Sequence, residues 1–290
     1  MKRATIVLLF GCSFSAFAQS PDVLIKLDAR LNYRTENGGT STIRWYDSLG
    51  RASTVGLEMT LEPGFRLIVK ERFQKFANDP ISDQLDEAYL EDQDYWRVGK
   101  QYLPFGRGNF LWESVPAFRV TTNLGGLDVP TTIAIAASDR GKPRGVVARI
   151  GGRYGLSAAA GENFSIGPTS LTLIRGIDDS PGVGRGYRKA LGADYAVRHD
   201  TTRYVVEVAT LRDGHSELDK SFEVSDFSVT TEPSKHRSLT LGWTRRWDTG
   251  DNFFRGMTSL RVADNAKLDA YVRIRNGVVW DLNVALAVKL

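Results

Sequence analysis

Residues 280–290 read WDLNVALAVKL, and large apolar side chains occupy every second position of this stretch. Successive side chains of a β-strand point to opposite faces, so one face would be apolar and the other polar or small. The apolar face would carry Trp280, Leu282, Val284, Leu286, Val288 and Leu290. Strands in soluble sheets are about 5–6 residues long, whereas a strand that crosses a membrane needs about 9–11. We therefore interpret residues 280–290 as the closing strand of a transmembrane β-barrel.

The same two-residue period recurs along the chain, for example over 23–34 and 268–275, and Asn276-Gly277 is a strong hairpin turn. The candidate strands are 22–34, 51–62, 64–75, 85–92, 94–101, 129–137, 144–152, 155–162, 166–175, 187–198, 202–212, 220–230, 236–247, 252–262, 266–275 and 278–290. The sequence thus predicts an all-β fold, a transmembrane antiparallel up-and-down β-barrel of about 16 strands. Fourteen strands is the alternative, because residues 129–175 are weakly patterned.

Two other architectures compete with the barrel. A soluble β-sandwich also has alternating strands, but several segments here run to ten residues or more, which favours the barrel. A helix would show a period of about 3.6 residues instead of two. After the first twenty residues, no apolar run approaches the roughly 20 residues of a membrane-spanning helix.

An even strand count places both ends of the chain on one side of the membrane, which in single-chain bacterial barrels is the periplasmic side. The short links at 62–64, 92–94 and 199–201 would lie on that same side. The longer stretches 35–50, 76–84, 102–128 and 176–186 would then be extracellular loops.

The first residues resemble a secretory signal. Lys2 and Arg3 precede the apolar run 4–10, and Ala16-Phe17-Ala18 provides the small residues that precede cleavage. We expect cleavage after Ala18, which leaves 1–18 as the signal peptide and 19–290 as the barrel. A lipoprotein-type box at 9–12 is the alternative.

Cleavage would remove the single cysteine, so neither a disulfide nor a cysteine-ligated metal is expected, and no metal or other cofactor is predicted. Loss of Lys2 and Arg3 would lower the formal net charge from +4 to +2. This charge is too small to indicate a nucleic-acid partner, and none is expected.

Basic residues outnumber acidic ones on the faces that would line the lumen. The pore-lining candidates are Lys26, Arg30, Arg66, Lys70, Arg72, Arg97, Arg273 and Arg275. The opposing acidic residues are Asp28, Glu58, Asp194, Asp269 and Asp281. Rings of like charge set the ion preference of pores, so this balance indicates weak anion preference. The alternative is that these ion pairs only fill and stiffen the wall.

The loop 102–128 is the third of the expected extracellular loops, and it is rich in aromatic residues and prolines. It would either fold into the lumen and narrow the channel or remain on the surface. If it folds inward, Arg107, Glu113 and Arg119 are its constriction candidates. A loop of this length in a compact domain is usually functional or disordered, and its composition argues against disorder.

Residues 86–91 read DEAYLE, and residues 96–106 read WRVGKQYLPFG. This strand pair resembles one in the phosphate-selective and siderophore-uptake porins of the outer membrane, over less than a tenth of the chain. The resemblance implies a sixteen-stranded diffusion channel that forms a homo-oligomer, such as a trimer. It does not carry over phosphate selectivity, because the dense basic arrays of those porins are not matched residue by residue.

The sequence therefore predicts an outer-membrane porin for passive diffusion of small hydrophilic solutes or ions, and not an enzyme. Its partners would be outer-membrane lipid and the barrel assembly machinery, which recognises a terminal strand that usually ends in Phe, where this chain has Leu290. The alternatives are a barrel enzyme (protease or lipid hydrolase) and a secreted β protein without a pore. His215, close to Asp213, could act as a general base, but Asp-Gly-His-Ser is typical of a turn.

Overall fold

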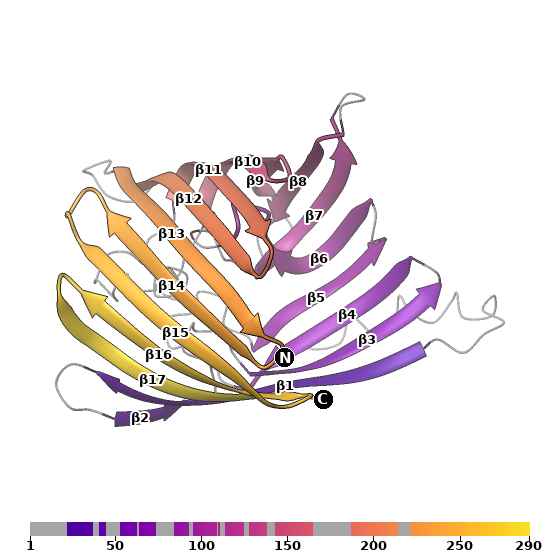
Figure 1. Cartoon of the computed structure of the whole chain (residues 1–290). Helices are drawn as coiled ribbons and strands as arrows, with labels where there is room; N and C mark the ends of the chain where they lie inside the picture. The colour runs from indigo at the N-terminus through magenta and orange to yellow at the C-terminus, as the bar shows by residue number, and fades with distance from the viewer. Residues whose placement is uncertain are drawn as a thin grey trace, which may run out of the picture.

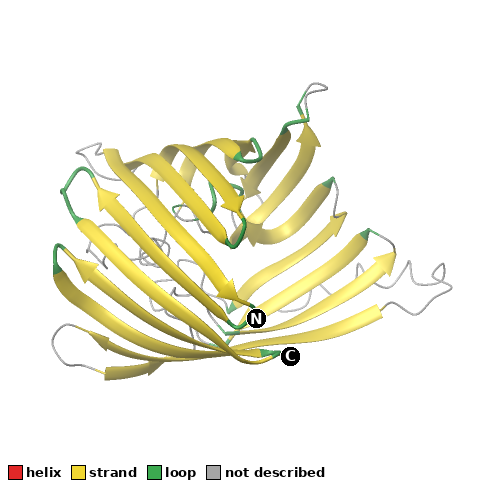
Figure 2. Cartoon of the chain, viewed as in Figure 1, coloured by secondary structure: helices red, strands yellow, loops and turns green. Residues whose placement is uncertain are grey.

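The computed structural model describes residues 22–36, 41–44, 53–62, 64–73, 84–92, 95–108, 110, 114–124, 128–137, 143–164, 187–213 and 221–290. Within these ranges the regular secondary structure is β-strand, joined by turns and loops (Figure 2). No helix in the described ranges is long and apolar enough to cross a membrane. The all-β prediction is confirmed.

The strands run antiparallel to their neighbours and are arranged side by side around a common axis (Figure 1). They are β1 (Asp22–Glu36), β2 (Ser41–Arg44), β3 (Thr54–Glu62), β4 (Phe65–Arg72), β5 (Leu85–Asp92), β6 (Trp96–Tyr102), β7 (Ser114–Asn123), β8 (Pro130–Ala137), β9 (Pro143–Ile150), β10 (Tyr154–Phe164), β11 (Tyr187–His199), β12 (Thr202–Asp213), β13 (Ser221–Ser234), β14 (Arg237–Arg246), β15 (Asn252–Ala263), β16 (Ala266–Arg275) and β17 (Val278–Lys289).

The barrel closes between β17 and β1. Residues 28–36 of β1 pair with β17, and Leu27 and Leu290 exchange both backbone hydrogen bonds at 2.9 Å. On its other edge, β1 pairs with β3 through residues 22–28 and with β2 through residues 32–35. Because β2 and β3 share one position in the wall, the described strands form a closed barrel of sixteen strands. The predicted closing strand and strand count are confirmed.

A side chain fills the interval that β2 and β3 leave along β1. Ser53 Oγ accepts a hydrogen bond from the Arg30 amide at 2.8 Å and donates one to the Arg30 carbonyl at 2.9 Å. Ser53 is fully buried, and its own carbonyl accepts a hydrogen bond from the amide of Phe73. The serine therefore satisfies backbone groups that no neighbouring strand reaches, as buried polar groups require.

The two ends of the barrel differ in their connections. The end where β1 begins and β17 finishes carries the links 63–64, 93–95, 124–129, 151–153, 200–201, 235–236 and 264–265. We call this the turn end and the opposite one the loop end. The three short links that the sequence placed beside the chain ends do lie at the turn end.

One predicted loop is wrong in its extent. Residues 102–128 contain β7, and residues 124–129 belong to the turn end, so the true loop runs only from 103 to 113. The predicted strand 166–175 lies outside the described residues, as does the signal region 1–18. The predicted count of sixteen therefore omits the strand at β7 and includes one segment that the structure does not describe.

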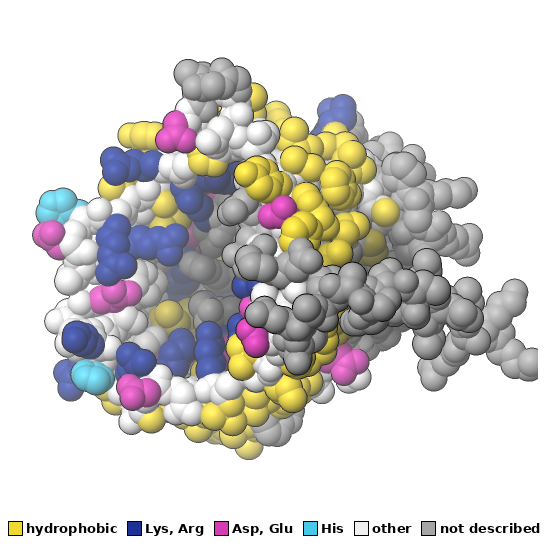
Figure 3. All heavy atoms as spheres, turned by 90° about the vertical axis from the view of Figure 1, so that its right-hand side faces the viewer, with side chains coloured by type: hydrophobic (Ala, Val, Ile, Leu, Met, Phe, Trp, Pro, Cys, Tyr) yellow, Lys and Arg dark blue, Asp and Glu magenta, His cyan; other side chains and the backbone are white. Residues whose placement is uncertain are grey.

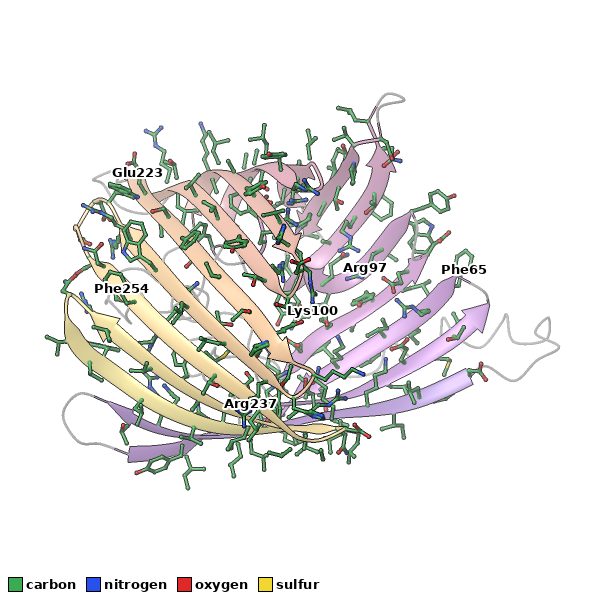
Figure 4. All side chains as sticks on the ribbon, viewed as in Figure 1. Phe65, Arg97, Lys100, Glu223, Arg237 and Phe254 are labelled. Carbon is green, nitrogen blue, oxygen red and sulfur yellow. The ribbon has the colours of Figure 1, made fainter. Side chains whose placement is uncertain are left out.

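The outer face of the wall is apolar. Exposed side chains at alternate positions include Ile135, Leu191, Leu241, Phe254 and Leu282. Phe65 and Trp96 meet edge to face near the turn end, whereas Trp243 and Phe254 stack near the loop end. Figure 4 shows Phe65 and Phe254 toward opposite ends of the barrel. An apolar band between two sets of aromatic side chains is the outer surface expected of a transmembrane barrel.

Candidate functional site in the barrel lumen

The inward faces of the strands are the candidate site, because a closed barrel of about 16 strands leaves room for an aqueous channel. Figure 3 looks at the barrel from the right-hand side of Figure 1, toward the turn end. The molecule is hollowed in this view, and Lys and Arg side chains gather along one side of the hollow.

On β3 to β6, two carboxylates each bind two basic side chains. Glu91 on β5 accepts hydrogen bonds from Arg66 Nη2 at 2.5 Å and from Arg97 Nη2 at 2.7 Å. Glu58 on β3 accepts from Arg66 Nη1 at 2.9 Å and from Lys26 of β1. These contacts form one continuous network across the inner wall, because Arg66 joins both carboxylates.

Nearer the loop end, the same wall holds two further ion pairs. Lys70 Nζ lies 2.5 Å from Glu87 Oε2, and Arg72 Nε lies 2.8 Å from Asp86 Oδ1. The hydroxyl of Tyr102 also donates to Asp86 Oδ1, at 2.7 Å. The carboxylates of β5 are thus neutralised by basic residues of β4, directly beside them in the sheet.

Basic residues also face each other directly across neighbouring strands. Four such cross-strand pairs have both members on the inner face: Arg97 with Arg119, Arg198 with Arg203, Arg255 with Arg273, and Arg261 with Lys267. Like charges in this position are destabilising. In the described part of the chain, Arg119 and Arg203 form no ion pair. The positive charges of these two side chains are therefore not neutralised by any described carboxylate, whereas Arg97, Arg198, Arg255, Arg261 and Lys267 each have one as a partner.

The most buried ion pair in the lumen is between β13 and β15. Arg255 Nη1 and Nη2 contact the two carboxylate oxygens of Asp226 at 2.7 and 2.9 Å, and Arg255 Nη1 also contacts Thr244 Oγ1 at 2.8 Å. Both charged side chains are almost fully buried. Bidentate geometry of this kind fixes both side chains. The two charges neutralise each other, so this pair adds little net charge to the lumen.

The loop after β6 folds into the lumen. We call residues 103–110 the inward loop; residue 109 lies outside the described set. Phe105 and Phe110 are at most 1% exposed and pack on small or apolar inward residues of the wall. These wall residues are Val115, Ala117, Ala134, Ala136, Val147, Ala159, Ala190, Ala209, Leu211, Val224 and Phe253. Of the two predicted alternatives, inward folding is the one the structure has, for this shorter loop.

Polar contacts fix the inward loop on β10 and β11, three to five strands along the wall from β6 and β7. Arg107 Nε lies 2.5 Å from Asp194 Oδ1, and Arg149 Nη2 binds the same carboxylate oxygen at 2.7 Å. The amide of Gly106 donates to Ser157 Oγ at 2.9 Å. The loop thus lies over the wall from β7 to β11, which narrows the lumen beside it.

Two glycines permit this close approach. Gly106 has a φ of +53°, and a Cβ there would lie 1.8 Å from Glu207 Oε1. A Cβ at Gly192 would lie 2.9 Å from the ring of Phe105. A side chain at Gly106 would require the Glu207 carboxylate to move, and one at Gly192 would require the Phe105 ring to move.

The structure places the predicted site residues as follows. Lys26, Arg30, Arg66, Lys70, Arg72, Arg97, Arg273 and Arg275 all lie on strands at inward positions. They do not form one cluster: Arg275 contacts Asp251 at the loop end, whereas Arg66 and Arg97 share Glu91. That these residues line a conducting pore remains a prediction.

The structure does not bring the three constriction candidates together. Arg107 lies on the inward loop, and Glu113 is outside the described residues. Arg119 was wrongly assigned to the loop, because it lies on β7 in the barrel wall opposite Arg97. The sequence reasoning missed Arg149, Asp226 and Arg255, although the two-residue period of their strands places all three on inward faces.

The described residues contain no cluster of histidine, cysteine and carboxylate side chains that could hold a metal ion. His199 is the last residue of β11 and His236 lies in the β13–β14 turn, both at the turn end, and both are exposed. His199 Nδ1 is 3.3 Å from Asp200, also an exposed side chain. The Asp-Gly-His-Ser segment at 213–216 continues beyond the described residues after Asp213.

Comparison with solved structures finds similar barrels throughout the chain's length. The loop L8 deletion mutant of OmpT, an outer membrane protein of Vibrio cholerae, has 10% identity and a TM-score of 0.64, and the alignment covers 94% of this chain and 100% of that one. The outer membrane channel DcaP of Acinetobacter baumannii has 12% identity and a TM-score of 0.60, with 93% and 97% covered. An anion-selective porin from Comamonas acidovorans has 10% identity and a TM-score of 0.57, with 93% and 98% covered.

The chain matches no family model and no curated protein. At these identities the structural likeness establishes the fold alone. The chain has the closed, antiparallel, sixteen-strand fold of outer-membrane porins. The resemblance seen in residues 86–106 is thereby confirmed at the level of the fold.

Proposed function

We propose that this protein is an outer-membrane porin: a water-filled channel through which small hydrophilic solutes diffuse, with a preference for anions. The observation that carries the anion preference is that Arg119 and Arg203, on the inner face beside Arg97 and Arg198, form no ion pair among the described residues. Pore walls select ions by rings of like charge. Repulsion between basic side chains on neighbouring strands destabilises the barrel. Attraction of anions into the lumen is a function that explains why these side chains are present.

The distribution of carboxylates also supports a preference for anions. Glu58, Glu91 and Asp194 each contact two basic side chains, so none of them presents an unshared negative charge to the lumen. Arg119 stands next to Arg97 without an ion pair of its own among the described residues. Field lines from such groups are concentrated in a narrow passage between low-dielectric walls, and the inward loop provides the narrowing.

The apolar outer face and its aromatic residues support a location in the outer membrane, with lipid against the wall. We expect a signal peptide to direct export and the barrel assembly machinery to insert the chain. One of the similar structures is described as the trimer form of OmpT, and we propose a homotrimer here as well. Chemical cross-linking of the protein in native membranes would test this, since a single band at monomer mass would contradict it.

The function is tested with the refolded protein in a planar bilayer under a potassium chloride gradient. We expect stepwise conductance and a zero-current potential whose sign shows that chloride crosses more readily than potassium. Absence of steps from a heat-modifiable, correctly folded barrel would contradict the channel. A potential of the opposite sign would retain the channel and overturn the anion preference.

A further inference from the structure

A groove of about 430 Å³ lies on the outer face of the barrel, toward the loop end of β11 to β13. Its walls include Leu191, Val208 and Trp247, which are all exposed. Their neighbours along the strands, Ala190 and Ala209, are buried on the opposite face, under the inward loop. Alternation along each strand therefore places the groove outside the lumen, on the surface that lipid would cover.

Strand register explains why this part of the outer face is hollowed. Thr210 on β12 lies directly between Leu191 on β11 and Glu223 on β13. In the next outward row, Ala193 lies beside Val208. Side chains stand roughly perpendicular to a sheet, so the small side chains of Ala193 and Thr210 leave a depression between the larger Leu191 and Val208.

Trp247 forms the side of the groove next to the end of β14. Its amide donates to the carbonyl of Glu223 at 2.9 Å, and its indole Nε1 donates to Ser225 Oγ at 3.0 Å. Trp243 and Phe254 stack at the same end of the barrel, where Figure 4 shows Glu223 and Phe254. Aromatic side chains of a barrel gather at the boundary between hydrocarbon and water. The groove therefore lies where lipid headgroups meet their acyl chains.

Two basic side chains lie beside the groove on its loop-end side. Lys189 and Arg212 are directly opposite each other, one outward row beyond Leu191 and Thr210. Both are exposed, and Lys189 forms no ion pair with any described residue. Like charges in this position are destabilising, and an anion between them would remove that repulsion. Glu223 is the single carboxylate among the lining residues, so basic groups outnumber it here.

We propose that this groove binds one anionic lipid of the membrane leaflet at the loop end. An acyl chain would lie against Leu191, Val208 and Trp247, and the headgroup would contact Lys189 and Arg212. Apolar contact would hold any acyl chain, whereas charge-assisted contacts favour an anionic headgroup over a zwitterionic one. The inference goes beyond the channel, because it rests on the proposed location in a membrane and not on conduction.

Native mass spectrometry of the purified barrel in detergent tests the site. The anionic probe is dioleoylphosphatidylglycerol, and the zwitterionic probe is dioleoylphosphatidylcholine. We expect one phosphatidylglycerol to bind saturably and about tenfold more tightly than phosphatidylcholine. Lys189→Gln with Arg212→Gln should remove this preference. The matched control is Arg153→Gln with Lys235→Gln, which removes the same charge from exposed turns at the turn end and should retain the preference.

The apolar part of the site is tested by filling the groove. Thr210→Trp should weaken binding of both lipids, whereas Thr258→Trp, at an exposed outward position of β15, should weaken neither. Heat-modifiable migration on a gel shows that each variant is folded. If Thr210→Trp does not fold, Ala193→Leu narrows the groove by a smaller change.

Equal affinity of the wild-type barrel for the two lipids, or a preference that the Lys189 and Arg212 double variant retains, would overturn the proposal. Equal weakening by Thr210→Trp and Thr258→Trp would also overturn it, because the lipid would then be bound elsewhere. A barrel that conducts without this lipid preference would reject the site and retain the channel. A barrel that binds the anionic lipid in the groove but never conducts would retain the site and reject the channel.

Discussion

Arg107 and Asp194 join the inward loop to the barrel wall, with Arg107 Nε 2.5 Å from Asp194 Oδ1. The carboxylate is fully buried and is held from its other side by Arg149. The loop is therefore docked at a preformed ion pair and is not simply enclosed by the barrel. Its position, and so the width of the passage, should depend on this contact.

Replacing Arg107 by Gln tests that dependence. The variant removes the loop's ion pair while Asp194 retains Arg149, so the barrel should fold. Loss of a charged contact in a partly buried position should weaken docking of the loop by about 1–3 kcal/mol. We expect a larger single-channel conductance and noisier open-channel current. Arg245→Gln is the control, because Arg245 stacks on Trp247 at an outward position of β14. Identical currents in the Arg107 variant and the wild type would contradict a docked constriction.

Gly106→Ala should displace the same loop by steric clash. A methyl group at this position would lie 1.8 Å from Glu207 Oε1. Gly108→Ala separates the clash from backbone strain, since Gly108 also has a positive φ, of +76°, but a Cβ added there would have no atom within 4 Å. Trypsin cleavage after Arg107 provides the measurement. We expect rapid cleavage in the Gly106 variant and slow cleavage in the Gly108 variant, and equal rates would show that strain alone matters.

The closing strand was predictable from sequence because both of its faces have simple surroundings. Leu282, Val284 and Leu286 face outward and are exposed, and the residues between them face the lumen. Apolar and polar residues alternate in the sequence because successive side chains face lipid and lumen in turn. The same reasoning correctly placed Arg66 and Arg97 on the inner face.

β7 was missed because its inward face does not meet water. Val115 and Ala117 point into the barrel but pack against Phe105 and Phe110 of the inward loop. Apolar residues consequently occupy both faces at the start of this strand, and Pro116 further resembles a loop signal. The weak pattern of β8 to β10 has the same origin, in Ala134, Ala136 and others of the docking surface. A period-two search cannot recognise a strand whose lumen side is covered by protein.

The contact between Arg107 and Asp194 could not be read from the sequence either. Each residue is an ordinary charged side chain within its own segment. Their pairing depends on how the loop crosses the barrel, which the register of β6 to β11 decides. Arg149 and Asp226 were overlooked for a related reason, since their partners lie on other strands at positions that only the register identifies.

Charge selectivity should depend on Arg119. Among the described residues it forms no ion pair, and it faces inward beside Arg97. Arg119→Glu should shift the zero-current potential in a salt gradient toward cation preference, because a positive charge at the wall becomes negative. The control is Arg245→Gln, since Arg245 stacks on Trp247 at an outward position of β14 and should not influence the lumen. A potential that Arg119→Glu leaves unchanged would place the selective region elsewhere.

A charged side chain on the outer face, in the middle of the membrane, should destabilise the barrel. Leu241 is exposed at the centre of β14, and Leu241→Arg should lower the free energy of unfolding by about 2–4 kcal/mol, the cost of a basic residue facing lipid. Ser238→Arg on the same strand faces the lumen side of the turn end and should cost less. Urea unfolding in lipid bilayers measures both. Equal effects would contradict the assignment of outward and inward faces.

Ser53→Ala should open the wall between β2 and β3. The variant removes Ser53 Oγ, which accepts a hydrogen bond from the buried Arg30 amide at 2.8 Å in the interval that β2 and β3 leave along β1. An unsatisfied buried group of this kind costs about 1–3 kcal/mol. Hydrogen exchange at the Arg30 amide should therefore accelerate, while the amide of Val284, in the paired region of β17, should exchange as before. Unchanged protection at Arg30 would mean that another group replaces the serine.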